Sequence, residues 1–232
     1  MASNNPVVVD RDRSRSFRRF GRVFSALAVL FVRIELPPVG QRPGPDQTPV
    51  IWAPNHRSMF DTMLGLIGLY RMGYVAGFFV TERYFQGTLT RWLLTRIGAI
   101  PVAGDGAGAR RTIAEGVARL EAGLNLVIMA EGRLVDPDER TRGIGPLEPG
   151  VTILAKRAGR PIMPAALIGT DEMLPPGNRF PRIRLGRRRV LLVRFGDPIA
   201  PDGRSRQVLD DLTEALAALV ESADTEHAEL SA

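Results

Sequence analysis

The sequence predicts an α/β fold: a single domain with a central mixed, largely parallel sheet flanked by helices, plus an N-terminal amphipathic helix. Two observations predict it. Short apolar runs of strand length alternate along the chain with longer segments in which apolar residues recur every three or four positions. The chain has 232 residues and no internal repeat, which suits one domain with a short appendage.

The composition excludes several kinds of chemistry. There is no cysteine, so disulfides and thiolate chemistry are excluded. His56 and His227 are the only histidines and lie far apart, so we expect no histidine-rich metal site. The net charge of +6 comes almost entirely from arginine, with Lys156 as the single lysine. A basic surface suits phosphorylated substrates, anionic membranes or nucleic acid, and charge alone does not separate these.

Residues 1–16 are polar and expected to be disordered, and an amphipathic helix is predicted to follow. Its apolar stripe comprises Phe17, Phe20, Phe24, Leu27, Phe31 and Ile34. The apolar run is far shorter than the roughly 20 residues that span a bilayer, and it does not end in a signal-peptide cleavage site. An aromatic stripe beside arginines favours a helix that lies in the membrane interface. The alternative is a helix packed on its own domain.

The other elements follow in order. A Pro- and Gly-rich linker over 37–49 divides the chain into residues 1–47, which hold the N-terminal helix, and the main domain, 48–232. Apolar runs predict strands over 50–53, 74–81, 98–102, 124–130, 161–168 and 190–196. Periodicity predicts helices over 61–70, 82–95, 112–122, 150–158 and 205–222. We expect a long polar loop over 136–149 and a frayed acidic tail that contains His227.

The turn between the first of these strands and its helix holds a histidine and an aspartate. His56 and Asp61 are five residues apart, so on one continuous helix they would point roughly 140° apart. They can meet only if His56 lies in the turn and Asp61 in the first turns of the helix. The carboxylate would then accept the Nδ1–H of the imidazole and leave Nε2 free as a general base for a substrate hydroxyl. Alternatively, Asp61 only satisfies backbone donors at a helix start.

A second polar group follows the strand over 124–130. Glu131, Gly132 and Arg133 come directly after this buried run. Open α/β sheets bind ligands outside the carboxyl ends of their strands, so both charged side chains are placed where a ligand binds. Arg133 can grip a phosphate with two hydrogen bonds, and Glu131 can orient a hydroxyl or hold Arg133 in place. The alternative is a solvated Glu–Arg pair in a turn.

The order and spacing of these features resemble the 1-acylglycerol-3-phosphate acyltransferases, a family of glycerolipid acyltransferases. His56 and Asp61, after Asn55, resemble its first motif, and Ile100–Val102 resembles the strand before its second. Glu131–Arg133 resembles the third motif, with Ala130 in place of the usual proline. The run 161–168, with its prolines, resembles the fourth. The resemblance covers about residues 48–200, which we take as the body of an acyltransferase catalytic domain.

The second motif departs from the family pattern. The family usually has an arginine shortly after this strand that binds the acceptor's phosphate, whereas this sequence continues with a glycine-rich stretch over 103–108. Arg110 and Arg111 follow, and the resemblance assigns them to the phosphate together with Glu131, Gly132 and Arg133. A glycine loop with no ligand is the alternative. In the fourth motif, the resemblance places Pro164 at the lining of the acyl site, and plain packing is the alternative.

The resemblance implies transfer of a fatty acyl group from acyl-CoA or acyl-carrier protein to 1-acylglycerol-3-phosphate (lysophosphatidic acid), making phosphatidic acid. His56 would be the base, assisted by Asp61. No cofactor or metal is implied, because the thioester is a co-substrate. The implied location is the cytoplasmic face of the cell membrane, on anionic phospholipid, as a peripheral or monotopic protein.

Other functions stay open. The same family fold could acylate glycerol 3-phosphate, a lysophospholipid or a glycolipid. A non-catalytic membrane-surface protein would not need both His56 and Asp61. Nucleic acid is not an expected partner, because the basic stretch over 182–189 has no interleaved aromatic residues.

Overall fold

The computed structural model describes residues 11–42, 48–104, 106–178, 180–183 and 188–232. Its helices are α1 (Arg11–Ala28), α2 (Asp61–Arg71), α3 (Thr88–Arg96), α4 (Gly106–Glu121), α5 (Gly150–Ala158), α6 (Thr170–Met173) and α7 (Ser205–Ser231). Its strands are β1 (Val32–Glu35), β2 (Ile51–Pro54), β3 (Ala76–Thr81), β4 (Ile100–Val102), β5 (Asn125–Val127), β6 (Ile162–Ile168) and β7 (Arg189–Phe195). Short 3₁₀ turns are η1 (Val39–Gln41), η2 (Glu82–Phe85) and η3 (Pro137–Glu139).

The seven strands form one sheet in the order β1-β7-β6-β2-β5-β3-β4. Pairing is parallel throughout except between β6 and β7, so β1 and β7 run against the other five strands. The predicted fold class, a single α/β domain with a mixed, largely parallel sheet, is confirmed. Five strands end at the same edge of the sheet, and this edge carries the segments with the predicted site residues.

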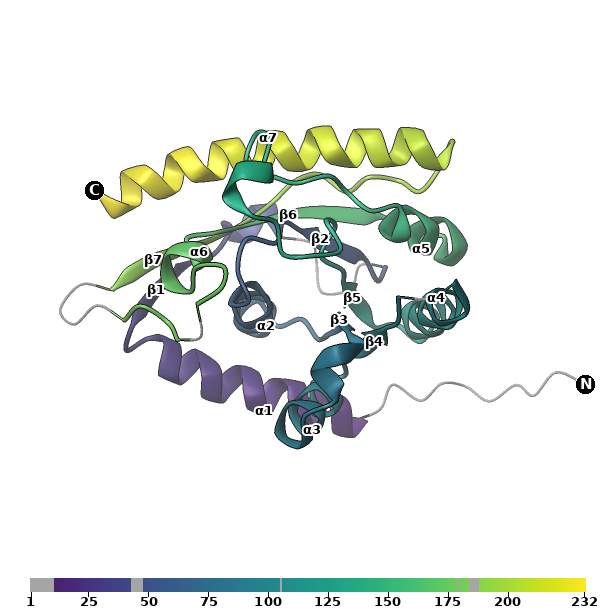
Figure 1. The fold of residues 1–232 in the computed structure, drawn as a ribbon, viewed down its shortest axis with the longest axis horizontal. Helices are drawn as coiled ribbons and strands as arrows, with labels where there is room; N and C mark the ends of the chain where they lie inside the picture. Colours follow the sequence, from purple (N-terminus) through teal and green to yellow (C-terminus); the bar gives the residue numbers. More distant parts are fainter. Residues whose placement is uncertain (1–10, 43–47, 105, 179, 184–187) are drawn as a thin grey trace, which may run out of the picture.

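Helices cover both faces of the sheet (Figure 1). One face carries α4, α5 and α7, whose apolar residues pack with strand residues such as Ile51, Leu126 and Ile162. The other face carries α1 and α2, which pack with Trp52, Phe78 and neighbouring residues of the strands. Each strand therefore buries both of its faces, which explains why the strands read as continuous apolar runs.

The N-terminal segment belongs to the same body as the rest of the domain. β1 pairs with β7, so the sheet begins before the expected boundary at residue 48. The predicted helical stripe is wrong beyond residue 28, because Phe31 lies in a turn and Ile34 lies in β1. Composition suggested a linker here because the proline- and glycine-rich stretch after residue 36 hides the pairing of so short a strand.

The stripe of α1 packs largely on the domain. Phe17 is buried and stacks on Phe78 with ring centroids 6.4 Å apart, and Phe20 and Phe24 are half-buried in the same cluster. Gly21 allows the close approach of α2, because a Cβ there would lie 2.5 Å from the Tyr70 side chain. The aromatic residues thus follow the alternative interpretation, in which the helix packs on its own domain.

The C-terminal tail is not frayed as predicted. α7 continues to Ser231, and His227 is buried, with its Nε2 3.0 Å from the carbonyl oxygen of Val190. The acidic composition misled the prediction because it describes only the outer face of this helix. In Figure 1, α7 runs along the whole length of the sheet.

Other boundaries differ in smaller ways. The helix expected over 82–95 is divided into η2 and α3, and the helix expected from residue 112 begins at Gly106. The helix over 150–158 agrees with α5. Part of the basic stretch over 179–189 lies outside the described residues, whereas Arg189 is described and its Nη1 lies 3.0 Å from Glu172 Oε2.

Candidate active site

The structure brings His56 and Asp61 together at the carboxyl edge of the sheet. β2 ends at Pro54 and α2 begins at Asp61, so the histidine lies in the connecting turn, as their spacing requires. His56 Nδ1 lies 3.0 Å from Asp61 Oδ2. The imidazole is 14% exposed, and no group among the described residues makes a hydrogen bond to its Nε2. The pair is therefore arranged to present Nε2 to a ligand.

The Asp61 carboxylate also organises the turn. It is fully buried, and its Oδ2 accepts the backbone N–H groups of Arg57 at 2.7 Å and Ser58 at 2.8 Å. Both sequence-based interpretations of Asp61 therefore describe the molecule: it satisfies backbone donors at a helix start and it contacts the imidazole. Oδ1 makes no hydrogen bond within the described part of the chain.

Glu131 lies next to the histidine, but its carboxylate contacts backbone rather than Arg133. Oε2 accepts the N–H of His56 at 2.5 Å and Oε1 accepts the N–H of Gly145 at 2.8 Å. Burial raises the pKa of Glu131, and the two N–H donors and the nearby imidazole oppose this rise. Glu131 thus links the ends of β2 and β5 and the loop before α5. Its geometry fits a residue that positions the turn better than one that binds the acceptor.

Arg133 points into solvent at the same edge. Its side chain is 56% exposed and forms an ion pair with Glu139 of η3. Gly132, which turns the chain between the two charged residues, has a φ of +67°, a conformation that L side chains rarely adopt. The glycine separates a buried carboxylate from an exposed guanidinium, so the two charged residues of this motif face different environments.

Comparison with known proteins identifies the protein family of this chain. Residues 38–168, more than half of the chain, match the model of a protein family described as Acyltransferase. The chain belongs to the acyltransferase family. This confirms the resemblance that the motifs predicted, and the matched stretch contains the predicted catalytic and phosphate-binding residues.

Two individual proteins are similar to this acyltransferase. A Brassica napus protein, 1-acyl-sn-glycerol-3-phosphate acyltransferase BAT2, chloroplastic, is 24% identical over 184 residues. That match covers 77% of the chain and 50% of the plant protein, so the chain spans about half the length of this relative. The crystal structure of the 1-acyl-sn-glycerophosphate (LPA) acyltransferase PlsC from Thermotoga maritima shares the fold, with a TM-score of 0.71 and 17% identity over 97% of this chain and 85% of that chain.

Arg110 and Arg111 of the acyltransferase follow a strand that is farther from the His56–Asp61 pair than the strand before Glu131 and Arg133. Both are exposed on α4, which follows β4 at the edge of the sheet. β4 lies three strands from β2, so at ordinary strand spacing the two strand ends are about 14 Å apart. The second half of the glycine-rich stretch, residues 106–108, forms the first turn of α4, and Asp105 lies outside the described residues.

An apolar cavity lies between α2 and the sheet. Its lining includes Trp52, Gly65, Gly68 and Phe195, and it extends to Pro54, two residues before His56. Pro164 does not line this cavity. A Cβ at Gly196 would lie 3.5 Å from the Cβ of Pro164 and would also contact Leu219 of α7, so Pro164 is on the α7 side of the sheet. Ala165 and Leu167 of the same strand line the cavity on the opposite side.

Three residues near the site were given no role in the analysis of the sequence, although Asn55 was interpreted as part of the first motif. Asn55 exchanges two hydrogen bonds with the backbone of Leu167, at 3.1 and 2.7 Å, and so joins the turn to β6. Its place between a strand and the histidine was a usable signal. Arg57 is buried and bonded to Asp224 of α7, 167 residues later, and no local pattern reports a partner so distant.

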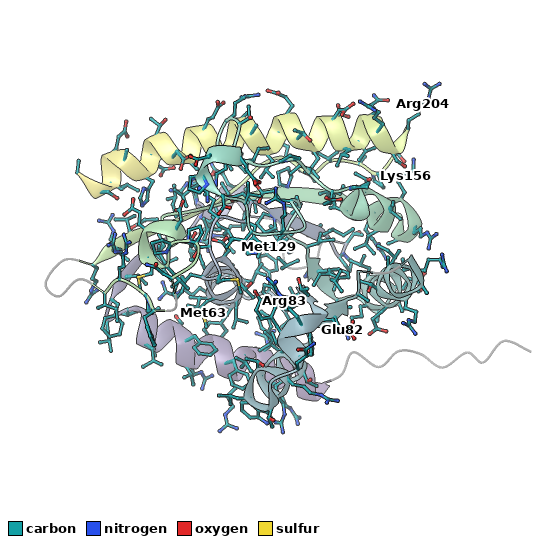
Figure 2. All side chains as sticks on the ribbon, viewed as in Figure 1. Met63, Glu82, Arg83, Met129, Lys156 and Arg204 are labelled. Carbon is teal, nitrogen blue, oxygen red and sulfur yellow. The ribbon has the colours of Figure 1, made fainter. Side chains whose placement is uncertain are left out.

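Arg83 is the third. Tyr84 Oη lies 3.4 Å from Met59 Sδ, which brings η2 next to the turn that carries His56. Figure 2 shows η2, marked by Glu82 and Arg83, at the same edge of the sheet as Met129, which follows β5. The Arg83 guanidinium stacks over the Tyr84 ring and forms no ion pair with the described residues.

The described part of the chain gathers no cluster of three or more histidine, aspartate or glutamate side chains suited to hold a metal ion. Of the helices described, none has the length and hydropathy needed to cross a membrane.

Proposed function

We propose that this acyltransferase transfers a fatty acyl group from acyl-CoA or acyl-carrier protein to the free hydroxyl of 1-acylglycerol-3-phosphate, which yields phosphatidic acid. The observation that carries the proposal is the His56–Asp61 pair, with Nδ1 and Oδ2 3.0 Å apart and Nε2 open, at the edge where parallel sheets bind ligands. The activities named for the two similar proteins support this choice of acceptor.

In the proposed reaction His56 is a general base. Its Nε2 takes the proton of the acceptor hydroxyl while that oxygen attacks the thioester carbonyl carbon. Asp61 stabilises the imidazolium that forms and fixes its orientation. The tetrahedral intermediate then collapses, the C–S bond breaks, and the imidazolium returns the proton to the thiolate. One ester forms and one thioester is lost, so no other reagent is needed.

The oxyanion needs hydrogen-bond donors close to His56. The N–H groups of Arg57, Ser58, Phe60 and Asp61 already have acceptors within the turn. Helix geometry leaves the following N–H groups of the first turn of α2 without intrahelical partners. These donors, near Met63, are the ones we assign to the oxyanion.

The acceptor phosphate is assigned to the exposed guanidinium of Arg133, which follows the strand beside β2. Gly132 and the backbone N–H of Glu131 belong to the same turn, and Arg83 belongs to η2, which follows the neighbouring strand β3. Arg110 and Arg111 would contribute only if the acceptor reached across the ends of β5, β3 and β4. The alternative acceptors are glycerol 3-phosphate, a lysophospholipid and a glycolipid, and the transfer assay below compares all of them with lysophosphatidic acid.

The acyl chain is assigned to the apolar cavity between α2 and the sheet. The cavity is bounded by apolar residues and by glycines of α2, and it extends to within two residues of His56. A chain lying there would have its carbonyl end near Nε2. We assign Ala165 and Leu167 of β6 to the lining, in place of Pro164.

We also propose that α1 and α3 form the membrane contact, with the protein a peripheral or monotopic one on the cytoplasmic face. Leu27 of α1 and Leu30 in the turn after it are 53% and 63% exposed, and Leu89 of α3 is 74% exposed. Trp92 of α3 is 48% exposed and meets the Phe20 ring of α1 edge-on, with centroids 5.6 Å apart. Nearby arginines of α1 supply attraction to anionic lipid: Arg18, Arg19 and Arg22 are all exposed.

Two experiments test these proposals. Purified protein is offered acyl-CoA and acyl-carrier protein with lysophosphatidic acid, glycerol 3-phosphate, a lysophospholipid and a glycolipid. His56→Ala should reduce transfer by about 10³-fold or more without unfolding the chain, and ordinary activity in that variant would refute the base. In vesicle co-sedimentation, Leu89→Ser with Trp92→Ser should lose binding to anionic vesicles, whereas Val39→Ser, at an exposed apolar residue of η1, should retain it.

A further inference from the structure

Arg57, the residue after the proposed base, directs its side chain away from the site and into the interface with α7. The side chain is 8% exposed. Its Nη1 and Nη2 each lie 2.7 Å from one carboxylate oxygen of Asp224. Nε and Nη2 also donate to the carbonyl oxygen of Gly143, at 3.1 and 2.9 Å. A two-pronged guanidinium–carboxylate pair of this kind fixes orientation as well as distance.

The backbone of Arg57 is held at the same time. Its N–H donates to Asp61 Oδ2 at 2.7 Å, the oxygen that also contacts His56 Nδ1. Its carbonyl oxygen accepts from Arg140, at 3.4 Å, and Arg140 is paired with Asp171 of α6 at 2.9 Å. A displacement of the Arg57 guanidinium would therefore move an N–H that holds the carboxylate partner of the proposed base.

The surrounding loop is shaped to fit the guanidinium. Gly143 has a φ of +80°, and a Cβ there would lie 2.4 Å from Arg57 Nη2 and 2.6 Å from Val220 Cγ1. Two residues later, the N–H of Gly145 donates to Glu131, which in turn holds the N–H of His56. The loop thus contacts Arg57 directly and reaches the backbone of His56 through Glu131.

The charge balance also favours a fixed arrangement. Burial lowers the pKa of Arg57, but the hydrogen bond and charge of Asp224, with smaller contributions from Asp171 and Asp61, outweigh it and leave the pKa raised. The guanidinium stays charged, and loss of Asp224 would leave a buried cation with only the Gly143 carbonyl as a side-chain partner.

We propose that Arg57 and Asp224 form a positioning pair through which α7 sets the geometry of the His56–Asp61 pair. Neither residue contacts substrate; the pair acts through the Arg57 N–H, which donates to Asp61 Oδ2. This inference rests on the proposed role of His56. It assigns the C-terminal helix a part in the reaction, beyond covering one face of the sheet.

Arg142 offers a matched control. It lies in the same loop and forms ion pairs with Glu214 and Glu221 of α7, but it has no described contact with residues 55–61. Arg142→Gln therefore removes two ion pairs between the loop and α7 without changing a contact of the turn. Arg57→Lys keeps the charge but removes the two-pronged geometry, and Asp224→Asn keeps the shape but removes the charge.

The kinetic experiment compares these variants in steady-state acyl transfer. Arg57→Lys and Asp224→Asn should lower kcat by about 10- to 100-fold with little change in the KM of donor or acceptor. Their double variant should be no worse than the poorer single one, because both disrupt one pair. Arg142→Gln should stay within about twofold of the parent. Circular dichroism identifies a variant that fails to fold, and Asp224→Asn, at a half-exposed position, is the one chosen to remain folded.

A spectroscopic experiment separates this inference from the proposed function. The chain has two histidines, so its ring N–H spectrum contains one signal set from His56 and one from His227, the internal reference. Arg57→Lys should shift or broaden the His56 signals and leave those of His227 in place, whether or not the parent protein transfers acyl groups. Unchanged His56 signals, or a loss of thermal stability with unchanged kcat, would overturn the positioning role. An inactive parent with shifted His56 signals would refute only the acyl-transfer proposal.

Discussion

The carboxylate of Glu131 accepts the backbone N–H of His56 at 2.5 Å, and so the end of β5 holds the turn that carries the proposed base. The second oxygen of Glu131 holds Gly145. A glutamate expected to contact substrate is thus committed to two backbone donors. Its function in the site depends on accepting at both oxygens, which only a carboxylate does.

Glu131→Gln should lower kcat by about 10- to 100-fold with little effect on the KM of the acceptor. An amide has one oxygen, so one of the two N–H groups would face an NH₂ group instead of an acceptor. Steady-state kinetics with varied lysophosphatidic acid measures this. A large rise in the acceptor KM with unchanged kcat would instead support direct contact between Glu131 and the acceptor.

The pH dependence of stability should also report on Glu131. Burial raises its pKa above the ordinary 4.5, so between these two values the native state binds the proton and the unfolded state has lost it. This contribution to the free energy of unfolding is fully present below pH 4.5 and is lost as the pH rises through the raised value. The free energy of unfolding, measured with urea across this pH range, should fall more steeply with rising pH in the parent than in Glu131→Gln. Parallel curves would contradict the raised pKa.

Asp61→Asn should reduce kcat by about 10²- to 10⁴-fold while leaving the fold intact. The amide oxygen can take the place of Oδ2 and keep the backbone bonds to Arg57 and Ser58, but the charge that stabilises the imidazolium is gone. Thermal unfolding and kcat measured on the same sample separate the two effects. Equal losses of stability and activity would assign Asp61 a structural role only.

Arg133→Gln should raise the KM for a phosphorylated acceptor by about tenfold or more, because one charge-assisted contact to phosphate is lost. Arg110→Gln and Arg111→Gln should have smaller effects, since α4 begins at the far edge of the sheet. The three KM values are compared with those for an acceptor that lacks phosphate. A reversed order would restore the assignment of the phosphate to the start of α4.

Gly68→Leu should shift donor preference toward shorter acyl chains. A Cβ at Gly68 would lie 3.6 Å from Val193 Cγ2 and 3.7 Å from Leu36 Cδ2, both ordinary contacts, and the atoms beyond it would occupy the cavity. Gly150→Leu serves as the control, because no atom lies within 4 Å of a Cβ at that position. The measurement is competition among acyl donors of different length. An unchanged profile in both variants would place the acyl chain elsewhere.

Local signals in the sequence were sufficient for the fold class and for the contact between His56 and Asp61. Buried strands leave continuous apolar runs, and amphipathic helices leave apolar residues every three or four positions. The four residues between His56 and Asp61 allow the two side chains to meet only if the histidine precedes the helix and the aspartate lies at its start. The apolar runs also located the strand ends that carry the site.

The rest depended on distant partners. Nothing near Arg57 predicts Asp224, and nothing near Glu131 predicts Gly145, because these contacts arise from the packing of loops on the sheet. The same limit explains the tail: the polar face of α7 dominates its composition, whereas His227 lies on the inner face. The N-terminal stripe also could not show whether its aromatic rings face lipid or Phe78.

The arrangement of β1 beside β7 has a consequence for biosynthesis. Among the described strands β1 is synthesised first, yet its neighbour in the sheet is β7, which is synthesised last of the seven. Such distant pairing is slow to form. β1 must therefore stay unpaired until β7 has been synthesised, and in that interval a chaperone is well placed to shield its open backbone groups.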